Sequence, residues 1–342
     1  MERERENEIL GMEPLAKLTQ ELLRAALNLQ PKEVRHLIDS YYQIQGHRIR
    51  LENQLRAATN LNELNPFINW LYKQQCGSEQ RIKAVLDAYS STRPEGKWAK
   101  SITGIGPVLA SGLLAYIEIE KAPTVGHIWR FAGLDPTLRW FGGDEAKRII
   151  SETLGRTTGP VTDDDIRVVA MVAERTPESI LRLWPIDKDG NLKPKTVASL
   201  AAALAKRPWN HRFKVLCWRI GTSFVRQRHR VGDFYGRIYE ARKELETRRN
   251  EAGEYAAQAA EILRTRKIGK TTEAYQYYKA GKLPPGQIEN RARRYAVKLF
   301  LAHYHEVAYR VRYGAPPPKP YPLAHLEHTE YIMPPNLHVI GL

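Results

Sequence analysis

The stretch KWAKSITGIGPVLASGLLAYI, residues 97–117, is the most informative part of this sequence for the fold. Two glycines, Gly104 and Gly106, enclose one apolar residue, and Pro107 follows them. Glycine is typical of a tight turn, because it adopts backbone conformations that a side chain would block. Proline is favoured in the first turn of a helix. The stretch therefore predicts two short helices joined by a tight turn, a helix-hairpin-helix motif.

The predicted turn has the chemistry of a phosphate-binding site. The first amides of a helix have no partner within the helix and favour an anion there. Lysines just upstream would add charge-assisted hydrogen bonds. Such a hairpin contacts the DNA backbone and does not identify bases. The alternative is an ordinary corner between two helices without a ligand. The residues expected to contact DNA here are Lys97, Lys100, Thr103, Gly104, Ile105, Gly106 and Val108.

On both sides of the hairpin, apolar residues recur at helical spacing. The spacing predicts helices over residues 7–30, 32–58, 66–90, 194–206, 210–263 and 287–313. No series of alternating apolar and polar residues predicts a sheet. We therefore expect a mainly α protein, a multi-helix bundle whose N-terminal part is amphipathic. A coiled coil there stays open, because Gly46 interrupts the pattern and sustained heptads are missing.

Composition shifts along the chain suggest five segments. They are an N-terminal helical region (1–92), the helix-hairpin-helix domain (93–141), an inserted linker and helical region (142–209), a basic helical domain (210–314) and a proline-rich tail (315–342). The inserted region is expected to open as a polar linker, because it contains several glycines.

The positive charge is concentrated in one part of the chain. The net charge is +15, yet residues 1–200 carry 27 Lys+Arg against 26 Asp+Glu, whereas residues 201–315 carry 25 against 10. A localised cationic surface is expected for a protein that binds a polyanion. The alternatives are a solvated basic face or an acidic protein partner. We expect duplex DNA as the partner.

Two stripes of basic residues would extend the DNA contact beyond the hairpin. Arg219, Arg226 and Arg230 recur at near-helical spacing, and Arg294 and Lys298 lie one turn apart on the last predicted helix. These five residues complete the predicted DNA-binding set. The alternative is that both stripes are solvated helix faces.

No metal site is predicted. Asp163, Asp164 and Asp165 precede an apolar helical stretch, where acids complement the helix dipole and cap free amides. His303 and His305 are two residues apart and would not share a helix face. The acids are therefore interpreted as a helix start, DKDGN at 187–191 as a turn, and no cofactor is expected.

The sequence predicts a cytoplasmic, nucleoid-associated protein without a membrane partner. No run approaches the roughly 20 apolar residues of a membrane span, and MERERENEIL has no apolar signal core. The two cysteines, Cys76 and Cys217, are far apart, which fits a reducing compartment. Homo-oligomerisation through the N-terminal helices is a further expectation.

The residues 102–117 and the following FAGLDP (131–136) resemble the C-terminal domain of the Piv-like insertion-sequence transposase family. Residues 212–225 and 291–314 are similar to the closing helices of that domain, and the helix at 30–60 to its coiled-coil region. The resemblance implies DNA recombination in a mobile element or phage, and a bridging RNA as a further partner.

Two departures from the family bear on catalysis. The family has an N-terminal ribonuclease-H-like domain with four metal-binding acids, whereas this chain opens with predicted helices, so Mg²⁺ is expected only if a partner supplies that domain. The family also has a catalytic serine in a Ser-Gly context, and Phe141 precedes Gly142 here. The catalytic residues are therefore unknown. We interpret the chain as a DNA-binding protein that is not catalytic alone. The alternatives are an active transposase with another nucleophile (Ser151 or Ser223) or a partner domain, and a structural assembly protein.

Overall fold

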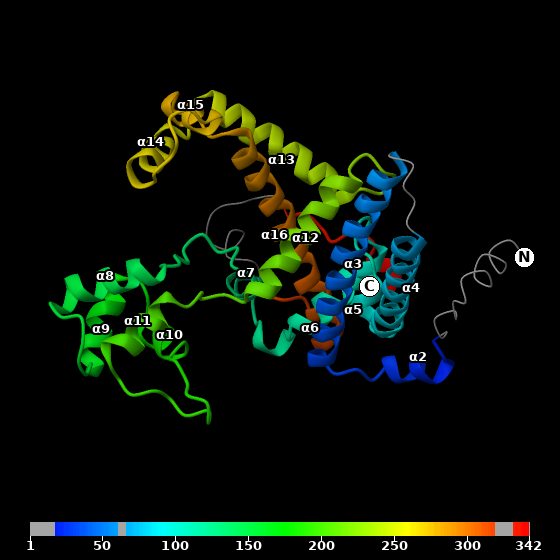
Figure 1. Cartoon of the computed structure of the whole chain (residues 1–342), viewed down its shortest axis with the longest axis horizontal. Helices are drawn as coiled ribbons and strands as arrows, with labels where there is room; N and C mark the ends of the chain where they lie inside the picture. Colours follow the sequence, from blue (N-terminus) through cyan, green and yellow to red (C-terminus); the bar gives the residue numbers. More distant parts are fainter. Residues whose placement is uncertain (1–17, 61–65, 319–330, 342) are drawn as a thin grey trace, which may run out of the picture. The chain divides into compact units, whose positions relative to one another are not determined.

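The computed structural model describes residues 18–60, 66–318 and 331–341 (Figure 1). Over these residues the chain is mainly α, and its only β-type pairings are two isolated bridges, Pro160 with Thr196 and Ile186 with Leu192. The prediction of a mainly α protein is confirmed.

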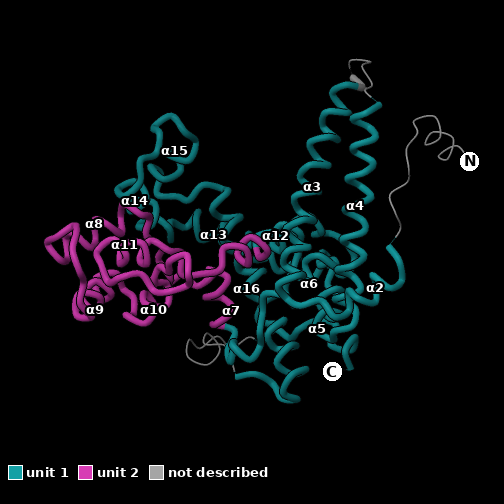
Figure 2. Tube along the Cα trace, turned by 60° about the horizontal axis from the view of Figure 1, so that its bottom comes forward, with its two compact units in different colours: residues 1–125, 218–342 teal, residues 126–217 magenta. Residues whose placement is uncertain are grey.

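The chain divides into two compact units, which Figure 2 colours separately. Unit 1 comprises residues 1–125 and 218–342, and unit 2 comprises residues 126–217. The division into five segments stays a prediction.

Unit 1 begins with a pair of long helices that pack along each other, α3 (Pro31–Asn60) and α4 (Pro66–Ser91). They confirm the helices predicted over 32–58 and 66–90. Gly46 lies within α3 and does not interrupt it, so the expected interruption is wrong. Of the helix predicted over 7–30, the described part is the short α2 (Gln20–Ala26), and residues 1–17 lie outside the description.

The hairpin helices α5 (Pro94–Ser101) and α6 (Pro107–Tyr116) pack on one end of this pair. A Cβ atom at Gly96 would lie 2.2 Å from the Ser90 carbonyl oxygen, so only glycine allows α5 to approach α4 this closely. On α6, the Ser111 hydroxyl donates to the Leu86 carbonyl at 2.8 Å. Apolar residues of three helices close the contact: Val34, Ile38, Tyr41, Leu86, Tyr89, Val108 and Ala115.

The second half of unit 1 is built from the basic segment. Its elements are the C-terminal part of α12 (His211–Gln227), α13 (Phe234–Glu251), α14 (Ala256–Thr265), α15 (Glu273–Lys279), α16 (Pro285–Tyr313) and the short η2 (Leu337–Ile340). The helix predicted over 210–263 is in fact three helices, because turns at Gly232 and Gly253 take positive φ angles of 78° and 82°.

An aromatic core ties the hairpin to this second half. Trp98 of α5 is fully buried and stacks on Phe300 of α16, with ring centroids 5.8 Å apart. Phe224 of α12 contacts Phe300 and also stacks on Tyr235 of α13. The hairpin is thus fixed by residues more than a hundred positions away in the sequence.

Unit 2 is a small helical body with its own apolar core. It contains most of α7 (Val125–Phe131), then α8 (Gly143–Leu154), α9 (Asp163–Val172), α10 (Pro177–Leu181), α11 (Val197–Ala205) and the start of α12. The polar linker expected around Gly142 and Gly143 is wrong, because α8 begins there and buries Ala146, Ile149 and Ile150.

The acids before α9 are a helix start, as predicted. The Thr162 hydroxyl accepts from the Asp165 amide at 3.1 Å, and the Asp165 carboxylate accepts from the Thr162 amide at 2.8 Å. Asp163 pairs with Lys195. In the predicted turn at 187–191, the Asp187 carboxylate accepts hydrogen bonds from the backbone amides of Asp189 and Asn191.

Candidate nucleic-acid interface

Two buried apolar side chains anchor the turn between α5 and α6 in the core. Ile102 and Ile105 are both buried, and the Ile105 amide donates to the Ile102 carbonyl at 2.9 Å. Gly104 has a φ angle of 96°, a conformation that L-residues rarely adopt. The predicted hairpin residue Val108 also points its side chain into the core. Any contact of Ile105 or Val108 with DNA would therefore come from the backbone.

Helix α12 holds the turn from the side. The Ser223 hydroxyl donates to the Gly104 carbonyl at 2.6 Å. A Cβ atom at Gly104 would lie 3.1 Å from that hydroxyl and 3.4 Å from the Gln227 side chain. Beyond α12, a Cβ atom at Gly232 would lie 3.3 Å from the Thr103 hydroxyl. The loop between α12 and α13 thus lies directly beside the hairpin turn.

The start of α6 is open. Gly106 is the N-cap residue and is exposed, and a Cβ atom placed on it would meet nothing within 4 Å. No side chain caps the helix, and its first turn contains no acid. The amides of Val108 and Leu109 precede the first internal hydrogen bond, which Ala110 donates to Gly106. The arrangement leaves room for an anion in front of a helix start.

Two arginines flank the connection between α12 and α13, whose Gly232 lies beside Thr103 of the hairpin turn. Arg226 is the penultimate residue of α12, and Arg230 lies in the loop that follows. Both side chains are exposed, and within the described residues neither has a hydrogen-bond or ion-pair partner. The loop is held by Asp233, a buried acid whose carboxylate accepts from the His229 amide at 2.8 Å. The neighbouring Arg228 faces Glu240 at 3.5 Å. Within the described part of the chain, Arg226 at the end of α12 and Arg230 in the loop therefore remain without a partner.

The remaining predicted cations are placed differently. Lys97 is exposed on α5, whereas the Lys100 ammonium bonds Asp87 at 2.6 Å. The Arg219 guanidinium lies over the Tyr42 ring, 3.1 Å from its centroid. On α16, the Arg294 side chain donates to the Asn290 carbonyl, and Lys298 is half-buried. Arg226 and Arg230 thus lie at the end of α12 and in the loop that follows it, while Lys100, Arg219 and Arg294 have partners within the protein.

Helix α12 also exposes an aromatic residue that the sequence pattern did not single out. Trp218 is 57% exposed and lies two turns before Arg226 on the same side of α12, with Thr222 between them. The spacing of four residues was visible in the sequence. A tryptophan at an apolar helical position, however, is usually interpreted as core.

The C-terminal residues 331–341 contact α5, the first helix of the hairpin. The Trp98 indole donates to the Pro335 carbonyl at 2.7 Å, and the Asn336 amide donates to the Ser101 carbonyl at 3.0 Å. Asn336 thereby satisfies a carbonyl at the end of α5. No local pattern indicated this contact, because it joins residues more than 230 positions apart.

The histidines of α16 are structural. His303 is buried, and its Nε2 donates to the Ile332 carbonyl at 2.8 Å, which leaves Nδ1 to accept from the Tyr235 hydroxyl at 2.7 Å. Burial lowers the pKa of His303 to about 4, so the ring is neutral at pH 7. Within the described residues, no cluster of His, Cys, Asp or Glu is arranged to hold a metal ion.

The serines considered as nucleophiles have simple hydrogen bonds. Ser223 holds the Gly104 carbonyl, and the Ser151 hydroxyl faces the Arg148 carbonyl at 3.4 Å. Phe141, at the position that the resemblance gives to a catalytic serine, is buried in the core of unit 2. The Arg175 guanidinium lies 5.2 Å from its ring centroid.

Residues 97–153 match the model of the Transposase IS116/IS110/IS902 family. The match begins three residues into α5, spans the hairpin and the FAGLDP turn, and ends in α8. The resemblance to insertion-sequence transposases is thereby confirmed over this segment. No curated protein and no solved structure matches the chain. None of the described helices is long and apolar enough to cross a membrane.

Proposed function

We propose that this protein binds duplex DNA through the opening of the hairpin, in a role related to transposition. A backbone phosphate would be held by the free amides at the start of α6 and by Arg226 and Arg230. The protein would position DNA without identifying its sequence, because amides and arginines at a phosphate contact no base. The family matched by residues 97–153 supports the connection to transposition.

The observation that carries the proposal is the open start of α6. Three features favour an anion: an exposed glycine N-cap, a first turn without acids, and two arginines without partners in the described chain that flank the neighbouring α12–α13 connection. Ser223 and Asp233 fix the two sides of this opening, so the phosphate site would exist before DNA arrives.

The test is the salt dependence of binding to a 30-base-pair duplex, measured by fluorescence anisotropy between 50 and 200 mM KCl. Each neutralised phosphate contributes about −0.9 to the slope of log K against log salt concentration. The double variant Arg226→Ala/Arg230→Ala is expected to bind with a slope less steep by about 1.8.

The matched control is Arg182→Ala/Lys188→Ala, which removes the same charge from exposed positions of unit 2. Its slope should stay close to that of the unchanged protein. Equal slopes for both double variants would mean that net charge alone governs binding, and the proposal would be wrong.

A further inference from the structure

A second group of free cations lies away from the hairpin, on a projecting part of unit 1 that we call the arm (residues 252–284). The arm comprises α14, α15 and their connections, and lies between the end of α13 and the start of α16 (Figure 1). Its apolar core is formed by Tyr255, Ala259, Tyr278 and Leu283 together with Ile288 at the start of α16. The arm is therefore a folded body.

The charges of the arm are unbalanced. It contains six Lys+Arg and three Asp+Glu. Two of the acids are occupied, since Glu254 faces Arg249 and Glu261 forms an ion pair with Arg264. Glu273 remains as the one acid without an ion pair in the described arm. The cations of the arm whose side chains have no partner there are Arg266, Lys267, Lys270, Lys279 and Lys282.

Three of these cations lie on one ordered loop between α14 and α15. Ile268, in the middle of the loop, packs on the core of the arm. The Thr272 hydroxyl donates to the Gly269 carbonyl at 2.7 Å, and the Gln276 side chain donates to the Lys270 carbonyl at 3.2 Å. The loop backbone is thus fixed while Arg266, Lys267 and Lys270 point outward, which reduces the entropy lost when an anion binds.

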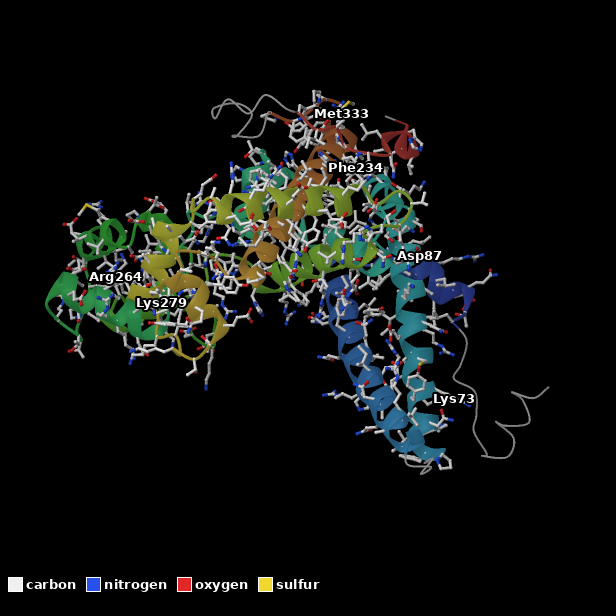
Figure 3. All side chains as sticks on the ribbon, turned by 90° about the horizontal axis from the view of Figure 1, so that it is seen from above. Lys73, Asp87, Phe234, Arg264, Lys279 and Met333 are labelled. Atoms are coloured by element: carbon white, nitrogen blue, oxygen red, sulfur yellow. The ribbon has the colours of Figure 1, made fainter. Side chains whose placement is uncertain are left out.

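Helix α13, and after it α14, separate the two cationic sites along the chain. Phe234 begins α13 just after the loop that lies beside the hairpin, and the arm follows the other end of the helix. Figure 3 labels Phe234 at one end, and Arg264 and Lys279 in the arm beyond the other. An 18-residue helix is about 27 Å long at 1.5 Å per residue. This length corresponds to about 8 base pairs at 3.4 Å each.

We infer that the arm loop is a second phosphate-binding site for the same duplex, more than about 8 base pairs from the hairpin site because α14 carries the loop beyond the end of α13 (Figure 3). The inference rests on the proposed function, because the hairpin supplies the other contact. Two sites separated by a rigid helix would bind a long duplex more tightly than either site alone, provided that the DNA spans both.

The experiment compares a 30-base-pair duplex with a GC-rich 8-base-pair duplex in the cold, using the full chain. The variant Arg266→Ala/Lys267→Ala/Lys270→Ala removes the three loop cations. On the long duplex its slope of log K against log salt concentration should be less steep by about 2.7, at 0.9 for each phosphate. On the short duplex, which cannot span both sites, the change should be less than half as large.

The control is Arg182→Ala/Lys188→Ala/Lys193→Ala, which removes three exposed cations of unit 2. Equal effects of the two triple variants on the long duplex would overturn the inference, as would an equal effect of the arm variant on both duplexes. These outcomes are separate from the proposed function, which depends on Arg226 and Arg230. If the hairpin double variant alone changes the slope, the proposed function stands and the arm site is rejected.

Discussion

Two helices of this protein start at a glycine that no side chain caps, and they differ in the charges that follow. The N-cap residue of α6 in unit 1 is Gly106, and that of α8 in unit 2 is Gly142. An added Cβ atom would meet nothing within 4 Å at either glycine. The first turn of α8 contains Asp144 and Glu145, whereas the first turn of α6 contains no acid.

The difference bears on the proposed phosphate site, because a helix start without acids leaves its dipole uncompensated. Acids in the first turn of α8 already complement the helix dipole and would repel a phosphate. At α6 no acid compensates the dipole, and Arg226 and Arg230 flank the α12–α13 connection, which lies beside the hairpin turn. The same backbone device therefore has opposite electrostatic surroundings in the two units.

The largest expected effect comes from placing an acid at each glycine. Gly106→Asp should lower the affinity for a 30-base-pair duplex at least tenfold, equivalent to about 1.4 kcal/mol. The carboxylate would occupy the place of the phosphate, while aspartate is a preferred N-cap residue and should keep α6 folded. Fluorescence anisotropy at 100 mM KCl measures the affinity.

Gly142→Asp is the matched control, because it adds the same charge at the same helical position. Its affinity should change less than twofold. Thermal unfolding should show that neither variant is destabilised. If both variants lose affinity equally, the start of α6 is no more an anion site than the start of α8.

A smaller effect is expected on stability, where alanine at the two glycines of the turn should lower the free energy of unfolding to different extents. Gly104→Ala should lower the free energy of unfolding by about 1–2 kcal/mol, because its φ angle of 96° is left-handed and its Cβ atom would press on Ser223. Gly106→Ala should cost only about 0.5 kcal/mol, because its φ angle of −92° suits any residue. The midpoint of urea unfolding measures both. Equal losses would contradict the interpretation that Gly104 shapes the turn and Gly106 opens it.

The helices could largely be predicted from the sequence, because each buries an apolar stripe with a regular period. α3, α4 and α16 lie within two residues of their predicted bounds. The errors have local causes. Gly46 costs a long helix little when its surroundings are open, and the breaks at Gly232 and Gly253 depend on positive φ angles that no periodicity reveals.

The candidate site could be predicted only in part. The hairpin was visible because the turn requires its residues at fixed spacing, and the family match covers the same segment. The role of individual cations was not visible, because it depends on long-range neighbours. Lys100 meets Asp87 and Arg219 meets Tyr42, whereas Arg226 and Arg230 stay free. The charge excess of the arm was not visible either, because the sequence does not show that Glu254 and Glu261 form ion pairs.

The smallest expected effect is a difference in acid sensitivity between the starts of α6 and α9. The Thr162 amide, which donates to the Asp165 carboxylate, lowers the pKa of that acid, and Lys195 lowers the pKa of Asp163. An acid whose pKa is lowered on folding stabilises the fold above its ordinary pKa, and this stabilisation is lost as the pH falls through the lowered value. The start of α9 should therefore loosen below about pH 4, whereas the start of α6 has no acid to protonate.

Hydrogen exchange detected by mass spectrometry at pH 2.5–5 can follow both helices, after correction for the intrinsic rate at each pH. In the variant Asp165→Asn, the α9 amides should exchange at pH 5 as fast as they do in the unchanged protein at pH 2.5, after correction for the intrinsic rate. The control is Asp164→Asn, because the Asp164 carboxylate caps no amide. If the corrected protection of α9 and α6 falls in parallel with pH, the carboxylates do not distinguish the two helix starts.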